Sequence, residues 1–457
     1  MAREQGHEVG RWVWVSFMVV AVLVSPLPAA FSPIRGATGF VTSVSSAGST
    51  AGWIQTNLNF SGFTTFGTAY DPANQDLYLL SQLNEPGPWG GLVAVFSGLS
   101  YARIAQIPMH QYPAGPVFDT LNQEMYVAST SLSGQLLAID SASNQVVGNI
   151  TTIPSYPEPP ILDTATGNLY VGWAQVFTYG LTIVSGSENR IVGNLSLSAF
   201  PLGGVFDPLN GDLYLSSFSP NEVVVVSGAS QSVVSTLDLS GQPGQPMFDP
   251  QNDEIYLPIG SLDEILGISS ETNQVVSTIL VGTSPATPVL DPANGLLYVS
   301  NSGSNNISVI SGSSNSVVAT IPSVPSPHGI LFDPRTQYLY VSSWTGNYSG
   351  ELCVISGVDT TDGFVSLGAD PDLTILDNAT GDLLVSDTLS GGTRAAVTVV
   401  GVNDSGLAPA SCEPPPSTTP APSLIPLAFV GVILALPIAA VIVSVVGSRR
   451  NRRQVRE

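Results

Sequence analysis

The chain has 457 residues and a formal net charge of −22 at pH 7, although charged residues make up only 10% of it. All 12 basic residues are arginines, and five of them lie after residue 448. A chain this acidic is excluded as a nucleic-acid binder, because a phosphate backbone would be repelled. Polyanionic glycans are disfavoured by the same repulsion, whereas cations and neutral sugars are not.

Residues 1–30 have the pattern of a secretory signal peptide. Two arginines accompany an apolar run from Trp12 to Val24, and small residues follow it. Because Pro28 is an unfavourable residue close to the expected cleavage point, an uncleaved N-terminal anchor remains the alternative. We expect residues 31–50 to be a linker.

Residues 51–404 repeat one motif, of which VFDPLNGDLYLSS (205–217) is a clear copy. Its first Asp recurs every 42 to 48 residues, a Tyr follows seven residues later in seven of eight copies, and a Pro lies six residues before the Asp in seven. The repeated aspartates are Asp71, Asp119, Asp163, Asp207, Asp249, Asp291, Asp333 and Asp377. A fixed period of this length indicates a repeat architecture.

Each period contains four short strand patterns and no helical periodicity. In the copy around Asp207 they are GVF, DLYLSS, VVVVSG and VVSTLDL. Four antiparallel strands per period are the content of one propeller blade. The sequence therefore predicts an all-β fold, a β-propeller of eight four-stranded antiparallel blades, with seven blades as the alternative if the first copy is not a blade.

The last copy lacks its fourth strand, because the chain leaves the pattern after VTVVG (397–401). The missing strand has a candidate at the other end of the repeats, where WIQTNLNFSG, from Trp53, resembles VVSTLDLSG, from Val233. An N-terminal strand paired with the final blade would remove the open edges of the ring. We predict that the ring is closed in this way.

Three different segments follow the repeats. Residues 405–423 are rich in Pro, Ser and Thr and are expected to form an extended stalk. Residues 424–446 carry no charge, and these 23 residues exceed the roughly 20 that a transmembrane helix needs. The arginines of residues 447–457 are typical of a cytoplasmic flank. The prediction is a single-pass protein of the cell membrane, with an extracellular N-terminal ectodomain and a cytoplasmic basic tail.

The repeat P-x-G-h-h-h-D-P-x-x-G-x-L-Y-V-x-N, with a later V-x-V-I-S-G, is best represented by residues 297–321. It resembles the YVTN repeat of the β-propellers in archaeal surface-layer and YncE-like proteins. The resemblance covers about residues 52–402 and implies a propeller at an archaeal cell surface. It implies no catalytic residues, because these propellers share no catalytic set, and Trp173, Ile259 and Asp387 stand where one copy has Asn301.

The recurring Asp-Pro turn has the composition of a calcium loop but not its spacing. In DPLNGD, from Asp207, Gly is fifth and positions three and five lack carboxylates. Asp and Asn cap their own turns, and Gly supplies positive φ. We therefore predict a structural turn, with weak cation binding as the alternative, and no metal or cofactor.

Polar candidates occupy the x of P-x-G, where the connections between blades should ring one mouth of the channel. They are Glu158, His328 and Asp372, and the last two belong to adjacent repeats. The favoured interpretation is that single polar residues face water there, and the alternative is a metal or acid/base site. His110 is the only other histidine after the signal, so the means for catalysis are few.

Aromatic residues mark the loops between second and third strands, which open at that same mouth. They are Trp89, Trp173, Phe177, Tyr179, Phe218, Trp344 and Tyr348. Exposed aromatic rings suit stacking on sugars or on apolar peptide surfaces. The alternative is that they only pack the loops against the ring.

The two cysteines, Cys353 in a third strand and Cys412 in the stalk, form a disulfide in one interpretation and remain unpaired thiols in the other. The sequence as a whole predicts a non-enzymatic binding, adhesion or envelope-assembly module. Its expected partners are cell-envelope proteins or neutral glycans. The alternative is an extracellular propeller enzyme of the lyase or lactonase type with its site at the channel mouth.

Overall fold

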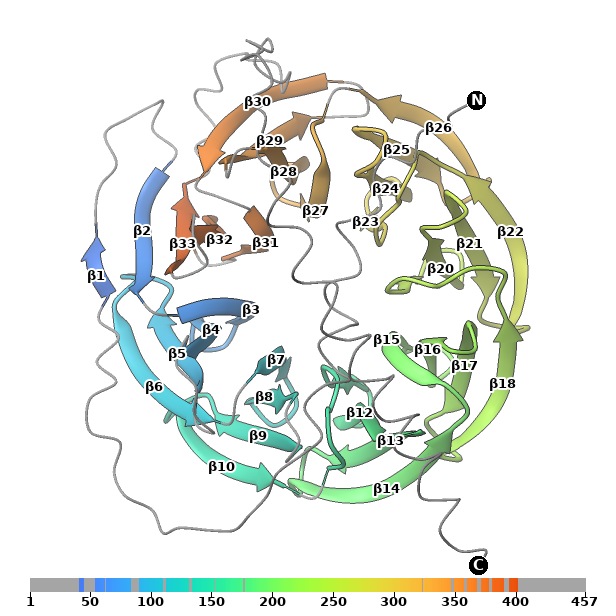
Figure 1. Ribbon diagram of the computed structural model, residues 1–457, viewed down its shortest axis with the longest axis horizontal. Helices are drawn as coiled ribbons and strands as arrows, with labels where there is room; N and C mark the ends of the chain where they lie inside the picture. Colours follow the sequence, from blue (N-terminus) through green and yellow to red (C-terminus); the bar gives the residue numbers. More distant parts are fainter. Residues whose placement is uncertain are drawn as a thin grey trace, which may run out of the picture.

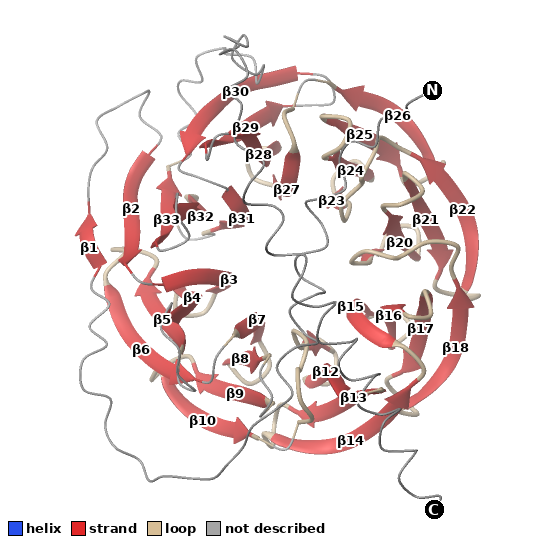
Figure 2. Ribbon diagram, in the orientation of Figure 1, coloured by secondary structure: helices blue, strands red, loops and turns tan. Residues whose placement is uncertain are grey.

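The computed structural model describes residues 41–401 except 45–53, 62, 84–89, 110–111, 131–133, 152, 176, 323, 347–348, 357–359, 368–370, 378–379 and 390–393. These residues form eight antiparallel sheets arranged radially around a central opening (Figure 1). Figure 2 shows that the described elements are strands joined by loops. The predicted eight-bladed propeller is confirmed, and the seven-bladed alternative is excluded.

The strands of the first four blades follow one another along the chain. Blade 1 contains β3 (Phe63–Asp71), β4 (Asp76–Leu83), β5 (Gly91–Ser97) and β6 (Arg103–Met109). Blade 2 contains β7 (Pro113–Asp119), β8 (Glu124–Ser129), β9 (Gln135–Asp140) and β10 (Gln145–Ile150). Blade 3 contains β11 (Ile161–Leu162), β12 (Asn168–Gln175), β13 (Thr178–Ser185) and β14 (Arg190–Leu197). Blade 4 contains β15 (Phe200–Asp207), β16 (Asp212–Phe218), β17 (Glu222–Ser227) and β18 (Ser232–Asp238).

The next three blades repeat this order. Blade 5 contains β19 (Met247–Asp249), β20 (Glu254–Ile259), β21 (Glu264–Ser269) and β22 (Gln274–Leu280). Blade 6 contains β23 (Val289–Asp291), β24 (Leu296–Asn301), β25 (Asn306–Ser311) and β26 (Ser316–Ile321). Blade 7 contains β27 (Pro327–Asp333), β28 (Tyr338–Gly346), β29 (Ser349–Ser356) and β30 (Thr360–Leu367). In every blade the first strand borders the channel and the fourth lies at the rim (Figure 1).

Blade 8 joins the two ends of the repeat region. It contains β31 (Pro371–Leu376), β32 (Leu383–Leu389), β33 (Arg394–Val400) and, from the N-terminal side, β2 (Ile54–Ser61). β2 pairs antiparallel with β33, from Ile54 opposite Val400 to Ser61 opposite Arg394. The predicted closure by an N-terminal strand is confirmed.

A fifth strand in blade 8 differs from the sequence prediction. β1 (Val41–Val44) pairs antiparallel with the outer edge of β2, although residues 31–50 are predicted to be a linker. The segment VTSV contains three β-branched residues in four, a composition that suits a strand. Four residues without a flanking turn motif were too short a signal to separate from a linker.

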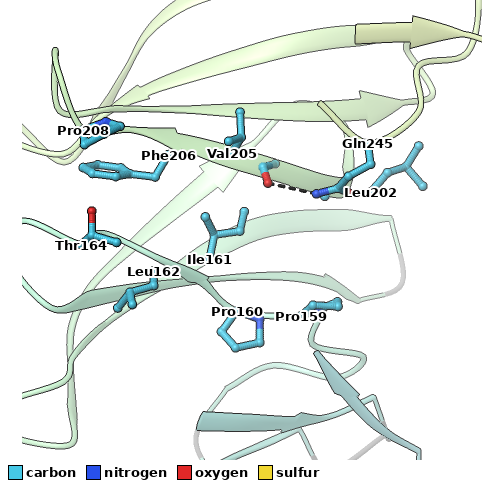
Figure 3. A pocket seen from close by; sticks show the side chains of 12 residues that line it. Pro159, Pro160, Ile161, Leu162, Thr164, Leu202, Val205, Phe206, Pro208 and Gln245 are labelled. Carbon is cyan, nitrogen blue, oxygen red and sulfur yellow. Dashed lines mark hydrogen bonds between the residues drawn. The ribbon is translucent and has the colours of Figure 1, made fainter. Parts of the chain in front are cut away.

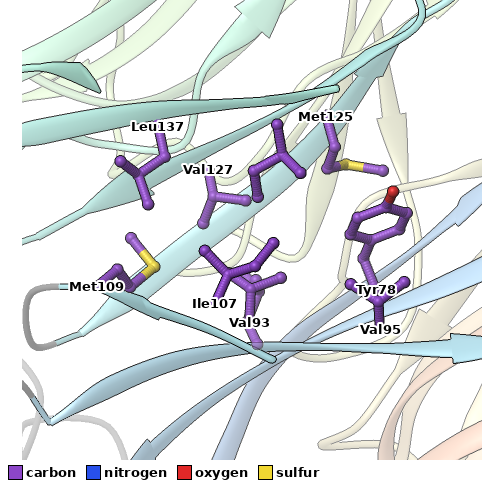
Figure 4. Packing of buried hydrophobic residues seen from close by; sticks show 10 residues of the cluster. Tyr78, Val93, Val95, Ile107, Met109, Met125, Val127 and Leu137 are labelled. Carbon is purple, nitrogen blue, oxygen red and sulfur yellow. The ribbon is translucent and has the colours of Figure 1, made fainter. Parts of the chain in front are cut away.

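The hydrophobic core lies between the blades. In Figure 4, buried side chains of blade 1, including Tyr78 and Val93, meet Met125 and Val127 of blade 2. A similar cluster closes the ring, where Phe96 of blade 1 contacts buried Val397 of blade 8. Because second and third strands are covered on both faces, segments such as EVVVVS of β17 are apolar without alternation.

The recurring Asp caps its own turn. In seven blades a carboxylate Oδ1 accepts the backbone N–H two residues later at 2.8 to 2.9 Å. The fifth position of the turn has a positive φ, for example +77° at Gly211 and +61° at Gln75. This geometry agrees with the predicted structural turn.

In four blades the recurring Tyr ties its blade to the next one. Its buried hydroxyl donates to the side-chain oxygen of an Asn in the neighbouring blade's turn between third and fourth strands. The pairs are Tyr78–Asn144 at 2.9 Å, Tyr126–Asn189 at 3.0 Å, Tyr214–Asn273 at 2.7 Å and Tyr256–Asn315 at 2.7 Å. These four bonds explain why a Tyr, and not merely an apolar residue, follows the Asp.

Several sequence predictions fall beyond this region. The predicted signal (1–30), stalk (405–423), transmembrane helix (424–446) and basic tail (447–457) lie outside the described residues. Within the part that the structure describes, there is no helix long and apolar enough to cross a membrane.

Candidate functional site

The antiparallel order of the strands gives the ring two different mouths. The turns between first and second strands and between third and fourth strands lie at one end, here named the turn mouth. The loops between second and third strands and the connections between blades lie at the other end, here named the loop mouth. Because Glu158, His328, Phe177, Tyr179 and Trp344 belong to such loops or to the strand ends beside them, all five lie at the loop mouth.

The P-x-G motif sets a fixed ring of backbone positions at the loop mouth. Its Pro lies opposite the end of the second strand, as in Pro157–Trp173 and Pro285–Asn301. The next N–H then donates to that strand, at 2.7 Å from Glu158 to Gly172 O. In this way the same backbone geometry presents residues that vary around the ring.

The three polar candidates are spread around this ring. Glu158 precedes β11 in blade 3, whereas His328 lies on β27 in blade 7, on the far side of the channel in Figure 1. Asp372 lies on β31 of adjacent blade 8, and its side chain is outside the described residues. The ring therefore holds Glu158 and His328 four blades apart and does not bring them into one site.

Glu158 occupies an apolar environment at the channel wall. A Cβ atom on Gly172 would lie 3.6 Å from the Glu158 Cβ and 2.9 Å from the Pro201 Cγ, so these residues pack closely. The side chain is half-buried, and no described residue gives it an ion pair or a side-chain hydrogen bond. Burial alone raises the pKa of its carboxyl from 4.5 to about 7.

His328 is exposed and belongs to a second small cluster in blade 7. Its ring Nε2 lies 3.4 Å from Ser326 Oγ, and its carbonyl accepts a 2.9 Å hydrogen bond from Ser300 of blade 6. The carbonyl of Ser326 in turn accepts the N–H of Trp344 at 3.3 Å. Trp344 is 44% exposed, so His328 and Trp344 share an accessible part of the loop mouth.

An aromatic group, defined by Tyr179, Phe200 and Phe218, joins blades 3 and 4. The Phe200 ring meets Tyr179 edge to face, with centroids 6.0 Å apart, and meets Phe218 at 5.2 Å. Phe177, at the tip of the β12–β13 hairpin, is 91% exposed. A side chain this exposed contributes little to folding, and its ring is accessible at the loop mouth.

Trp173 has a different role from these residues. A Cβ atom on Gly180 would lie only 2.2 Å from the indole Cζ2, so the ring of Trp173 lies against the backbone of β13. Its Nε1 is buried and has no hydrogen-bond partner in the described part of the chain. Trp173 therefore packs against its own hairpin. This agrees with the alternative interpretation, in which the aromatic residues only pack the loops against the ring. Trp89 and Tyr348 lie outside the described residues.

A pocket of about 580 Å³ opens in the channel wall between β11 and β15 (Figure 3). Its lining comprises Pro159, Pro160, Ile161, Leu162, Thr164, Leu202, Gly203, Gly204, Val205, Phe206, Pro208 and Gln245. Gln245, from the segment before β19, donates from Nε2 to Gly204 O at 3.0 Å. The lining contains no charged side chain, and its volume lies within the usual range of ligand pockets.

The sequence explains the pocket, although the sequence analysis did not find it. β11 has only two residues, because Pro159 and Pro160 have no N–H with which to extend a ladder. Opposite them, Gly203 and Gly204 contribute no side chains to fill the gap. The segments PEPP (157–160) and LGG (202–204) were the available signal, but their effect depends on the packing of two neighbouring blades.

The remaining chemical predictions stay open or find no support. Among the residues that the structure describes, no group of three or more His, Cys, Asp or Glu side chains could hold a metal ion. Cys353 is buried on β29 in the core between blades 6 and 7. Because Cys412 lies outside the described residues, the Cys353–Cys412 disulfide remains a prediction.

The described ring is similar to several solved propellers. It matches "Dihydro-heme d1 dehydrogenase NirN in complex with DHE" over 73% of this chain and 74% of that chain, with a TM-score of 0.58 and 13% identity. It also matches the hydrazine synthase of Kuenenia stuttgartiensis over 65% and 96% of the two chains, with a TM-score of 0.50 and 14% identity. The Cps50 (Swd1) β-propeller domain of Myceliophteria thermophila aligns over 65% and 98%, with a TM-score of 0.49 and 10% identity.

The comparisons support the fold and nothing finer. At 14% identity or less, a shared propeller carries no information on activity, because one fold hosts many functions. Neither a family model nor a curated protein sequence matches the chain.

Proposed function

We propose that this protein is a non-enzymatic propeller of the cell surface, tethered to the membrane by residues 424–446, which binds envelope proteins or neutral glycans at its loop mouth. One observation carries the proposal: at the loop mouth of blades 3 and 4, the exposed Phe177 lies on the same hairpin as Tyr179, whose ring meets the partly buried Phe200 of blade 4 edge to face. Aromatic rings provide contact area at a small cost in side-chain entropy. The resemblance to YVTN-repeat propellers of archaeal surface layers supports the same setting.

The charge of the chain supports this choice of partner. With a net charge of −22, the protein repels polyanions over a long range, whereas neutral sugars and peptide surfaces approach without that cost. The predicted stalk of residues 405–423 would hold the ring away from the membrane and leave the loop mouth accessible.

An enzyme of the lyase or lactonase type is the second candidate. It is favoured by Glu158, whose carboxyl has a pKa near 7, a value suited to a general acid or base at neutral pH. Its weakness is the distance across the channel, because His328 lies four blades away.

The proposal is tested by binding of the purified full-length chain to a neutral-oligosaccharide array and to a detergent-solubilised envelope fraction. Phe177→Ala and Phe218→Ala should weaken binding by roughly fivefold or more each if these rings are anchors. Leu209→Ala is the matched control, because Leu209 is also an exposed apolar residue, 62% exposed, but lies at the turn mouth. Normal binding by both aromatic variants, together with a loss of binding in Leu209→Ala, would contradict the proposal. It would show that partners bind at the turn mouth.

A further inference from the structure

The pocket between blades 3 and 4 has a chemistry distinct from the aromatic surface beside it. Its walls are mostly hydrocarbon, contributed by Pro159, Ile161, Val205 and Phe206 among others, and it lacks any charged lining residue. Gln245 and Thr164 are the polar side chains that line it. Such a cavity favours an uncharged, apolar body.

The carboxyl group of Glu158 has no ion-pair partner among the described residues, and Glu158 directly precedes the lining residue Pro159 without being a lining residue itself. Pro159 and Leu202 both line the pocket, and the residues immediately before them, Glu158 and Pro201, approach the same point beside Gly172. Glu158 is therefore next to the pocket at the loop-mouth end. It is half-buried among Pro157, Pro159, Gly172 and Pro201, which bear no charge, so no described cation balances its carboxylate.

We infer that this pocket binds a small organic cation, with the apolar body between β11 and β15 and an ammonium group at Glu158. The pocket walls remove the apolar part from water, and the ammonium ion supplies the missing counter-charge. The acidic chain attracts cations over a long range, and an anion of the same shape would be repelled both by the whole chain and by Glu158.

The pH dependence of binding follows from the same carboxyl group. Burial is the only cause of the raised pKa of about 7, and no charged or titratable group faces Glu158 from β12 or β15. The carboxyl is thus mostly neutral at pH 5.5 and mostly ionised at pH 8.5. A cation stabilises the ionised form, so binding should strengthen as the pH rises through 7, with proton release.

Three isosteric indole probes test the inference on the full-length chain by calorimetry or saturation-transfer NMR. They are tryptamine, which is a cation, tryptophol, which is neutral, and indole-3-acetate, which is an anion. At pH 8.5 tryptamine should bind roughly tenfold more tightly than tryptophol, as expected for a charge-assisted hydrogen bond, and indole-3-acetate should bind most weakly. At pH 5.5 the advantage of tryptamine should shrink, while tryptophol should be unaffected.

Substitutions separate the charge from the cavity. Glu158→Gln should abolish the difference in affinity between tryptamine and tryptophol. Glu271→Gln is the control, because it changes the net charge equally but lies at an exposed turn of blade 5, and it should preserve that difference. Leu202→Trp should fill the pocket and therefore weaken the binding of tryptophol as well as that of tryptamine. A ring is compatible with that position, because Phe66 occupies its equivalent in blade 1. Thr164→Trp, at the other end, is a second blocking variant if Leu202→Trp does not fold.

Four results would overturn the inference. Equal affinities for tryptamine and tryptophol, or tryptamine binding unchanged by Glu158→Gln, would show that Glu158 does not bind the ammonium group. Absence of tryptamine binding at millimolar concentration, or full binding by a folded blocking variant, would show that the pocket is not the binding site. Phe177→Ala should leave tryptamine binding unchanged, so failure here is distinguishable from failure of the aromatic surface.

Discussion

The turn mouth and the loop mouth use the same repeat in opposite ways. At the turn mouth, the Asp caps its own turn in seven blades, and in four blades the hydroxyl of the Tyr reaches an Asn of the next blade. At the loop mouth, the Pro of the motif keeps one register against the second strand, but the residue after it varies from Gly244 to Glu158 and His328. The Asp Oδ1 atoms in seven blades and the Tyr hydroxyls in four blades are thus satisfied within the ring at the turn mouth, whereas the side chains at the loop mouth have no such repeated partners.

The difference teaches where to look for function in a repeat protein. Identical solutions in successive blades indicate that a segment only has to close a turn or join two blades. Departures from the repeat, such as the exposed Phe177 or the adjacent prolines before β11, are not required to close a turn or to join two blades. Because binding residues concentrate on loops held by a rigid scaffold, we locate function at the loop mouth of blades 3 and 4.

The strongest test of the scaffold is to open the ring. Deleting residues 51–61 removes β2, and β33 then loses the partner that it meets from Ile54–Val400 to Ser61–Arg394. We expect destabilisation on the order of 5 kcal/mol or more, or loss of a cooperative transition, because the unpaired edge and the adjoining core of blade 8 become exposed. Thermal unfolding of the full-length variant, followed by circular dichroism, measures the effect.

The matched control for this deletion is removal of residues 41–44. β1 only adds a fifth strand outside β2, so its loss leaves all eight blades with four strands. The melting temperature should fall far less than in the 51–61 deletion. If the two deletions have equal effects, β2 does not close the ring.

A substitution at each mouth tests the comparison directly. Tyr214→Phe removes a buried hydroxyl that donates to Asn273 Oδ1 at 2.7 Å, and should cost about 1–3 kcal/mol of unfolding free energy. Phe177→Ala deletes a whole ring at the loop mouth but should change stability by less than about 0.5 kcal/mol, because Phe177 is 91% exposed. Denaturant titration measures both, and a larger loss in Phe177→Ala would contradict the division of roles.

Tyr170→Phe is the internal control for the Tyr series. Tyr170 occupies the same repeat position, but its buried hydroxyl has no hydrogen-bond partner among the described residues. Its removal should be neutral or stabilising, because an unsatisfied polar group leaves the core. A cost equal to that of Tyr214→Phe would show that the aromatic hydroxyl contributes in another way.

The sequence predicted the fold almost completely, because the fold depends on a repeated pattern. The eight aspartates fixed the number of blades, and the similarity of WIQTNLNFSG to VVSTLDLSG located the closing strand. β1 escaped prediction because it pairs outside the repeat, where no period guides the assignment. The role of the Tyr also escaped, since its Asn partner lies about 60 residues away in another blade.

The candidate site was predicted only in part. The Pro register of the repeat assigned Glu158 and His328 to one mouth, but their positions around the ring depend on the blade count, and their role in binding stays a prediction. Trp173 and Phe177 look alike in the sequence, whereas Gly180 allows the first to pack against β13 and the second remains exposed. The pocket depends on prolines in blade 3, which lack N–H groups, and on glycines in blade 4, which lack side chains. Neither residue type carries a chemical group that would indicate a binding site in the sequence.

The buried carboxyl group of Glu158 should make the stability of the fold depend on pH. Its folded-state pKa of about 7 lies above the ordinary value of 4.5, so its neutral form stabilises the fold fully below pH 4.5, and this stability is lost as the pH rises through 7. Relative to Glu158→Gln, the wild-type chain should lose on the order of 2 kcal/mol between pH 5 and pH 8.5, with partial exposure already considered. Denaturant titrations at both pH values measure this difference, and parallel pH curves would contradict the burial of the carboxyl.

A small gain in stability should come from repairing a defect at the turn mouth. Gln231 stands where other blades have an Asn such as Asn273, and it shares their left-handed backbone, with φ at +48°. Its Oε1 would lie 3.0 Å from a Cβ atom on Gly193, so the longer side chain turns toward β14 and leaves the hydroxyl of Tyr170 without a partner.

Gln231→Asn should therefore stabilise the ring by about 1 kcal/mol, because Asn reaches the Tyr170 hydroxyl and also tolerates a positive φ better than Gln. A double-mutant cycle with Tyr170→Phe separates the two contributions. If the hydrogen bond forms, most of the gain should vanish in the Tyr170→Phe background. An equal gain in both backgrounds would assign the whole effect to backbone preference, and the link between blades would not be the reason for the Asn at the turn mouth.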